Sequence, residues 1–260
     1  MTPKKPAASS SWTFCFALSL VCLTLLVVGP LPAEAVDSCI DCHKNPRFMV
    51  TNSKLFEYFQ EWEGSIHRQE DVDCSDCHGG NPDKLDKDGA HGQDLSGSAS
   101  MSAVNFENIP KTCGQCHEEI YKAYRKSNHF EHLATTDQEI QGPSCVTCHG
   151  SINVDVLDVN TVYESCARCH NEEEDNHPEN PKRARAILNK FLSIHRFYRF
   201  ITIRDPVGSK AFFSRVDDHI QELAVTWHTF DLDAIEKQTA LVLELLKAKR
   251  DEVRAHPAKQ

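Results

Sequence analysis

Ten of the twelve cysteines in this 260-residue chain form five Cys-x-x-Cys pairs, and a histidine follows each pair immediately. The five motifs are Cys39-x-x-Cys42-His43, Cys74-x-x-Cys77-His78, Cys113-x-x-Cys116-His117, Cys145-x-x-Cys148-His149 and Cys166-x-x-Cys169-His170. Two thiols three residues apart on one helical turn point the same way, so both can add to the vinyl groups of one porphyrin edge. The histidine that follows then reaches the iron as an axial ligand. The sequence therefore predicts five covalently bound haem c groups.

Two other uses of paired cysteines explain the pattern less well. Zinc sites also use Cys-x-x-Cys pairs, and exported proteins use disulfides. Neither use explains why a histidine follows all five pairs. The haem interpretation is therefore preferred.

Axial ligation decides what such irons can do, and methionine is too scarce to supply it. After the N-terminal segment, only Met49 and Met101 are available for five irons. Nine histidines lie outside the motifs, at His67, His91, His129, His132, His177, His195, His219, His228 and His256. Most irons are therefore expected to be bis-histidine ligated and of low potential, since Met/His ligation raises the potential.

A short repeat singles out two of these histidines as distal ligands. Residues 62–67 and 124–129 both read aromatic-x-x-Ser-x-His, and each precedes a Cys-x-x-Cys-His-Gly motif. His129 follows His117 by twelve residues in one expected helix, a separation of about 18 Å, so the two cannot flank one iron. We therefore predict that His129 ligates a neighbouring haem, and that His67 does the same by its place in the repeat.

The remaining distal ligands are less tightly specified. His91 lies in the loop Gly89-Ala90-His91-Gly92, where nothing else explains it, and we predict that it is a ligand. His195, His219 and His228 lie in expected helices, where a core histidine is the competing explanation. We take His195 and His228 as the candidates. His132 is interpreted as a surface neighbour, His177 as part of a polar linker and His256 as part of the C-terminal tail.

Residues 1–35 have the layout of a secretory signal peptide. They carry Lys4 and Lys5, an apolar run over 12–28 and the small-residue sequence Ala33-Glu34-Ala35. Cleavage after Ala35 predicts a periplasmic or otherwise extracytoplasmic protein. A retained membrane anchor is the alternative, because about 17 apolar residues is the lower limit for a membrane span.

The rest of the chain divides by composition into two domains. Residues 36–175 hold all five motifs, and the polar stretch 81–102 has too few apolar residues for a core of its own. We expect porphyrins to supply the interior of this pentahaem domain, with short helices at the motifs. After an acidic linker, residues 176–260 show three amphipathic helical patterns, over 187–198, 212–230 and 233–253. The first pattern is expected to place these residues on one apolar face: Ile187, Leu188, Phe191, Leu192, His195 and Tyr198. The predicted fold class is mainly α with long irregular loops, a haem-wrapped multihaem cytochrome domain followed by a C-terminal helical bundle.

The motifs resemble a known superfamily. The run 109–121, the sequence Ser127-Asn128-His129 and the sequence Asp76-Cys77-His78-Gly79-Gly80 are similar to the tetrahaem cytochrome c and hydroxylamine-oxidoreductase-like multihaem cytochromes. The resemblance covers residues 39–170. It implies closely stacked haems that pass electrons among redox partners, with the Ser-x-His histidine as a distal ligand. Residues 227–231 resemble the helical C-terminal regions of similar proteins, which favours His228 over His219.

These observations leave three functional hypotheses. The preferred one is a periplasmic electron carrier that relays electrons between redox partners. The second is a reductase or oxidase of a small nitrogen or sulfur compound with one open haem, although the Cys-x-x-Cys-Lys motif of related nitrite reductases is absent. The third is an electron-transfer subunit of a quinol-oxidising complex, with peripheral membrane association through a partner. Without residues 1–35 the chain has 26 basic and 37 acidic residues, which argues against a nucleic-acid partner. Oligomerisation is compatible with all three.

Overall fold

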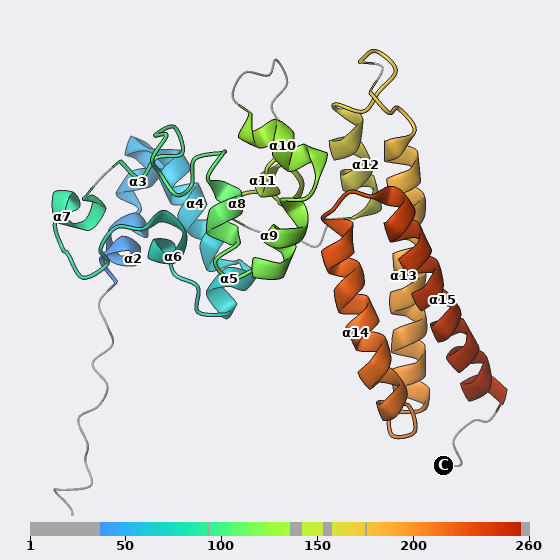
Figure 1. The fold of residues 1–260 in the computed structure, drawn as a ribbon. Helices are drawn as coiled ribbons and strands as arrows, with labels where there is room; N and C mark the ends of the chain where they lie inside the picture. Colours follow the sequence, from blue (N-terminus) through green and yellow to red (C-terminus); the bar gives the residue numbers. More distant parts are fainter. Residues whose placement is uncertain (1–36, 93, 136–141, 153–157, 175, 256–260) are drawn as a thin grey trace, which may run out of the picture. The chain divides into compact units, whose positions relative to one another are not determined.

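The computed structural model describes residues 37–92, 94–135, 142–152, 158–174 and 176–255. The predicted signal peptide at 1–35 and His256 lie outside these residues. The chain separates into two units, Met1–Asp37 and Ser38–Gln260, and the features below belong to the second. Within its described residues this unit is helical with irregular loops and has no strand (Figure 1), which confirms the predicted fold class.

Short helices dominate the region of the five motifs. They are α2 (Ser38–His43), α3 (Arg47–Thr51), α4 (Ser53–Glu63), α5 (Ile66–Gln69), α6 (Cys74–His78), α7 (Lys87–His91), α8 (Ile109–Cys113), α9 (Glu118–Tyr124), α10 (Asn128–Ala134), α11 (Cys145–His149) and α12 (Val159–Ala167). Helices α2, α6 and α11 each contain a whole motif, whereas α8 and α12 end within theirs. Each motif thus begins on a helical turn, as the attachment chemistry requires.

The second and fourth motifs start and stop their helices by the same local signals. Asp73 and Asp76 form a capping box at the start of α6, and Ser144 and Thr147 form the equivalent box at α11. Such boxes satisfy backbone N–H groups that the first turn leaves without partners. Both helices end at a glycine with positive φ, 73° at Gly79 and 76° at Gly150, a conformation that side chains with a Cβ disfavour. The Cys-x-x-Cys-His-Gly pattern therefore encodes a one-turn helix with a sharp exit.

The sequence repeat has the same structure in both copies. The buried Ser65 hydroxyl donates to the Trp62 carbonyl oxygen (2.7 Å) and caps α5. Ser127 makes the same contact with Tyr124 (2.6 Å) and caps α10. The aromatic residue of each copy donates a hydrogen bond to a carbonyl two residues before the next motif, from Trp62 to Val72 and from Tyr124 to Pro143. His67 and His129 therefore occupy equivalent positions in two copies of one unit. The single helix expected to join His117 and His129 is wrong, because α9 ends at Tyr124 and a new helix, α10, begins at Asn128.

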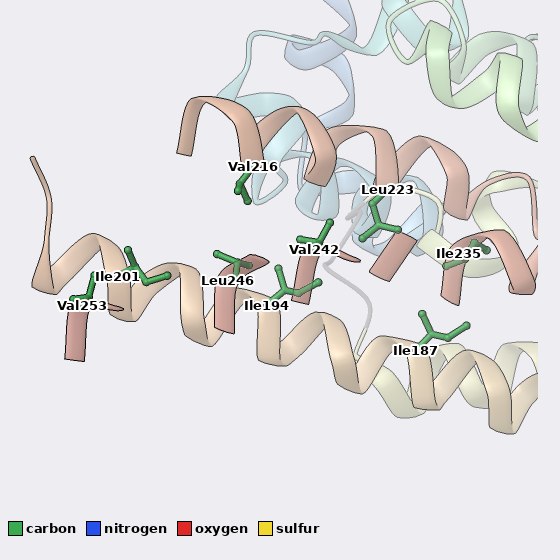
Figure 2. Close-up of a cluster of buried hydrophobic side chains, with 9 residues drawn as sticks. All are labelled: Ile187, Ile194, Ile201, Val216, Leu223, Ile235, Val242, Leu246 and Val253. Carbon is green, nitrogen blue, oxygen red and sulfur yellow. The ribbon is translucent and has the colours of Figure 1, made fainter. Parts of the chain in front are cut away.

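Three long helices follow, in the regions where the periodicity predicts them: α13 (Asn180–Arg204), α14 (Lys210–Trp227) and α15 (Leu232–Ala255). Helix α15 packs against both α13 and α14, and α12 packs against α13. The core of this group consists of aliphatic side chains, many of them seven residues apart along their helix (Figure 2): Ile187, Ile194, Ile201, Val216, Leu223, Ile235, Val242, Leu246 and Val253. A seven-residue spacing keeps one side of each helix facing its neighbour.

The predicted apolar face of α13 is wrong at two positions. We expected Leu192 and His195 on the face that packs inward, but both are exposed. The buried side chains of α13 that form the core are Ile187, Ile194 and Ile201, and Leu192 and His195 lie on the exposed surface of the helix.

Among the residues that the structure describes, no helix combines the length and the apolar character needed to span a membrane.

Candidate haem-binding site

All five motifs open into one large cavity. Its volume is about 3130 Å³, and its lining includes all ten motif cysteines and all five motif histidines. Pockets for single drug-sized ligands and cofactors typically measure about 300–1,000 Å³. The cavity therefore has room for several large groups, and the residues predicted to attach haem all reach it.

Neighbouring motifs along the chain are also neighbours in space. Helix α2 contacts α6, α8 contacts α11, and α11 contacts α12. Burial raises the pKa of the Cys77 thiol, and the nearby Cys113 and Cys116 raise it further, so the second and third motifs are adjacent. The thiols of Cys113 and Cys145 are hydrogen-bonded to each other, which joins the third motif to the fourth. The five motifs thus form a continuous series in chain order.

Three motif histidines face a second imidazole across a similar gap. The ring centres are 6.3 Å apart for His43 and His91, and 6.1 Å apart for His149 and His228. The centres of His170 and His129 are 5.8 Å apart. An imidazole nitrogen lies about 2 Å from a bound metal ion and about 1 Å from its ring centre, so two imidazoles sharing one ion have centres about 6 Å apart. Each pair therefore has the ring-centre separation that a single shared iron requires.

Hydrogen bonds fix the orientation of two of these rings. The Nδ1 of His228 bonds the Ala224 carbonyl oxygen (2.8 Å), and the Nδ1 of His170 bonds the Asn176 carbonyl oxygen (2.8 Å). Because a carbonyl oxygen can only accept, Nδ1 carries the proton and Nε2 keeps a free lone pair. Histidines that bind a metal commonly donate their other ring N–H to a carbonyl oxygen in this way, which fixes the tautomer and raises the basicity of the ligating nitrogen.

The environment of these rings also favours the neutral, ligating form. The pKa of His129 is lowered to about 4, mainly by burial and in addition by the nearby His170 and His132. The buried Nδ1 of His129 has no hydrogen-bond partner among the described residues. Burial likewise lowers the pKa values of His43, His78, His149 and His228. A neutral imidazole has the free lone pair that metal binding needs, so these residues fit a haem iron.

The remaining predicted ligands are not brought into such pairs. His67, His78 and His117 line the cavity, but in the described part of the chain no ring contact joins them to another histidine. His195 is exposed on α13 and is not in the cavity lining. His219 is also outside the lining, with its Nδ1 3.9 Å from a Glu222 carboxylate oxygen.

Comparison with known proteins identifies the class of the motif region. Residues 99–171, which hold the last three motifs, match the family described as cytochrome c7 and related cytochrome c. Over 154 residues the chain is 26% identical to the multiheme cytochrome MtrA of Shewanella baltica (strain OS185), covering 56% of this chain and 40% of that protein. No solved structure matches the chain. Residues 99–171 thus resemble a cytochrome c7-like multihaem domain.

The match supports c-type haem and electron transfer in general terms. The narrower resemblance to the tetrahaem and hydroxylamine-oxidoreductase-like superfamily stays a prediction.

Sequence reasoning missed two residues beside the fifth motif of this multihaem region. The Phe230 ring makes an edge-on contact with His129 (centres 4.3 Å apart), and its backbone has a positive φ of 57°. His177, interpreted as part of a polar linker, lines the cavity with its ring centre 6.4 Å from that of His170. The fold alone brings Phe230 to His129, whereas His177 follows His170 by only seven residues, a local contact that the polar-linker interpretation overlooked.

Proposed function

We propose that this protein carries electrons between redox partners outside the cytoplasm, using five covalently attached haem c groups. The observation that carries the proposal is the set of three imidazole pairs beside one cavity that all ten motif cysteines line. Bound haem supplies reversible one-electron chemistry at iron. The match to multihaem cytochromes supports the general class.

The residues would divide this work in a definite way. The ten motif cysteines would attach the porphyrins, and the five motif histidines would be proximal ligands. His91, His228 and His129 would be the distal ligands opposite His43, His149 and His170. The His177 ring lies at a similar distance from His170, but its side chain is 71% exposed, whereas the Nδ1 of His129 is buried, which favours His129. Two imidazoles on one iron leave no position for a substrate, so such a site can only exchange electrons. The contacts between successive motifs would keep the transfer steps short.

The repeat assigns one more distal ligand. His129 faces His170, which belongs to the second motif after it in the chain. His67 occupies the equivalent place in the first copy, and the second motif after it ends at His117. We therefore infer that His67 ligates the iron of His117. His195, the remaining sequence candidate, has no contact in the structure that supports a ligand role.

A second function rests on His78. No ring contact joins His78 to another histidine within the described residues, and an iron with one open position is what a reductase or oxidase of a small nitrogen or sulfur compound needs. The redox partners of the protein would be other cytochromes, membrane quinol-oxidising complexes or terminal reductase complexes. This chain could also be a subunit of such a complex. We also propose that residues 36–175 and 176–260 form two domains, with the boundary between residues 175 and 176.

One experiment separates the two functions. Optical and electron paramagnetic resonance spectra of the purified holoprotein would be recorded with and without carbon monoxide. Five haems per chain, all low-spin and all indifferent to carbon monoxide, would support the carrier and refute the enzyme. A high-spin signal from one iron in five that shifts with the gas would refute the simple carrier, and nitrite, hydroxylamine and sulfite would then be screened as substrates.

A further inference from the structure

Charge is distributed unevenly along the chain. Residues 36–175 contain 11 Lys and Arg against 26 Asp and Glu, whereas residues 176–260 contain 15 against 11. The motif region is thus strongly acidic, and the C-terminal region is basic although the whole chain has a formal net charge of −10. Such a separation gives the two regions opposite preferences for a charged surface.

The positive charge of the C-terminal region is concentrated on α13. This helix has seven Lys and Arg residues and no Asp or Glu. Seven of its exposed residues follow one another at steps of three and four, and we call them the basic face: Lys182, Arg185, Asn189, Leu192, Arg196, Arg199 and Ile203. Steps of three and four keep residues on one side of a helix. The basic face therefore forms a line about 32 Å long.

The acidic residues of the neighbouring helix do not neutralise this face. The α15 carboxylates Asp233 and Glu236 pair with Arg183 and Lys190, which lie off the basic face. No ion pair in the described part of the chain involves Arg196 or Arg199. Their charge is therefore available to an external anion.

Apolar side chains extend from the end of this line. Ile203 is 66% exposed, and Val207, in the turn between α13 and α14, is 76% exposed. The exposed cations Arg204 and Lys210 stand on either side of this turn. We call Ile203 and Val207 the apolar tip. Asp205 lies in the same turn, but its carboxylate accepts hydrogen bonds from the Gly208 N–H and the Ser209 hydroxyl. Exposed aliphatic side chains flanked by cations are suited to binding at a membrane interface.

We propose that the basic face and the apolar tip bind the anionic phospholipid surface of a membrane. The cations would lie among the headgroups, and Ile203 and Val207 would enter the boundary with the acyl chains. The acidic motif region would be repelled by the same surface, so the protein would bind with its C-terminal helices towards the membrane. This inference goes beyond electron transfer and does not depend on how the irons are ligated.

The test measures binding of the full-length holoprotein to vesicles by flotation. Wild type is expected to float with phosphatidylcholine vesicles containing phosphatidylglycerol, not to float with phosphatidylcholine alone, and to be released by high salt. Each Lys or Arg near an anionic surface contributes about fivefold to binding, so Arg196→Glu with Arg199→Glu should weaken it at least about 30-fold. Arg196→Gln with Arg199→Gln gives a milder second variant if charge reversal impairs folding.

The matched control reverses two exposed cations on the other helices, Arg215→Glu with Lys237→Glu, and changes the net charge equally. It should retain most of the binding. For the tip, Val207→Ser should weaken binding, whereas Leu241→Ser, at a leucine 50% exposed on α15, should not. Equal losses in the test and control pairs would overturn the proposal. Failure of wild type to float, with salt-sensitive self-association in its place, would show instead that the face binds the acidic region of a second copy.

Discussion

The pairing of His149 with His228 gives the sharpest prediction, because the two rings come from different parts of the chain. Their planes are only 14° apart, and the Ala224 carbonyl holds the His228 ring by its Nδ1. Full bis-histidine ligation needs five pairs of imidazoles, and the His228→Ala variant removes one imidazole from one of these pairs. One iron in five should therefore lose its distal ligand, become high-spin and bind carbon monoxide.

The assay is a carbon monoxide titration of the reduced holoprotein, read by difference absorbance and normalised to five haems. The variant should bind one more molecule of carbon monoxide per chain than wild type, and free imidazole should compete with it. His219→Ala is the matched control, since His219 lies on α14, the helix that ends just before His228, but outside the cavity lining. No additional binding in His228→Ala, or equal binding in both variants, would refute the assignment of His228.

Three further variants test other parts of the structure. Phe230→Ala should keep the full complement of haem but shift the low-spin resonance of one iron, because the edge-on ring contact that orients His129 is lost; an unchanged spectrum would show that the contact has no such role. Leu246→Ala, at a fully buried position, should lower the free energy of unfolding by about 2–5 kcal/mol in chemical denaturation. The exposed Leu241→Ala should change it by less than about 0.5 kcal/mol. Ser127→Ala removes the cap of α10 and should cost about 1 kcal/mol in the same assay, and no change would argue against the importance of the repeat.

Local chemistry made much of the motif region predictable. The motifs predict short helices, and the structure supplies the reason why one of them starts and stops where it does, in the capping box before α6 and the positive φ of Gly79. The Ser-x-His repeat likewise has a local cause, since each serine caps the helix that carries the histidine. Features that depend on a few neighbouring residues can be read from their order.

Local sequence could not predict which histidines pair with each other, or which side of each long helix packs inward. The paired residues are between 41 and 79 positions apart, for His129 with His170 and for His149 with His228. On α13, apolar residues occur on both sides of the buried core residues, so periodicity alone placed Leu192 on the wrong side. The packing of α13 against α15 and α12 decides which of its aliphatic residues become core.

The long separations between paired histidines have a consequence for how the protein matures. An iron held between His149 and His228 would close a loop much as a disulfide does, and long closed loops restrict the unfolded chain strongly. The large cavity has no polypeptide to fill it, so the chain alone lacks the interior that would hold the motifs together. Haem attachment and folding would then be one process. A chain that misses a single haem would lose a cross-link as well as a redox centre, and would be open to proteolysis before it could transfer an electron.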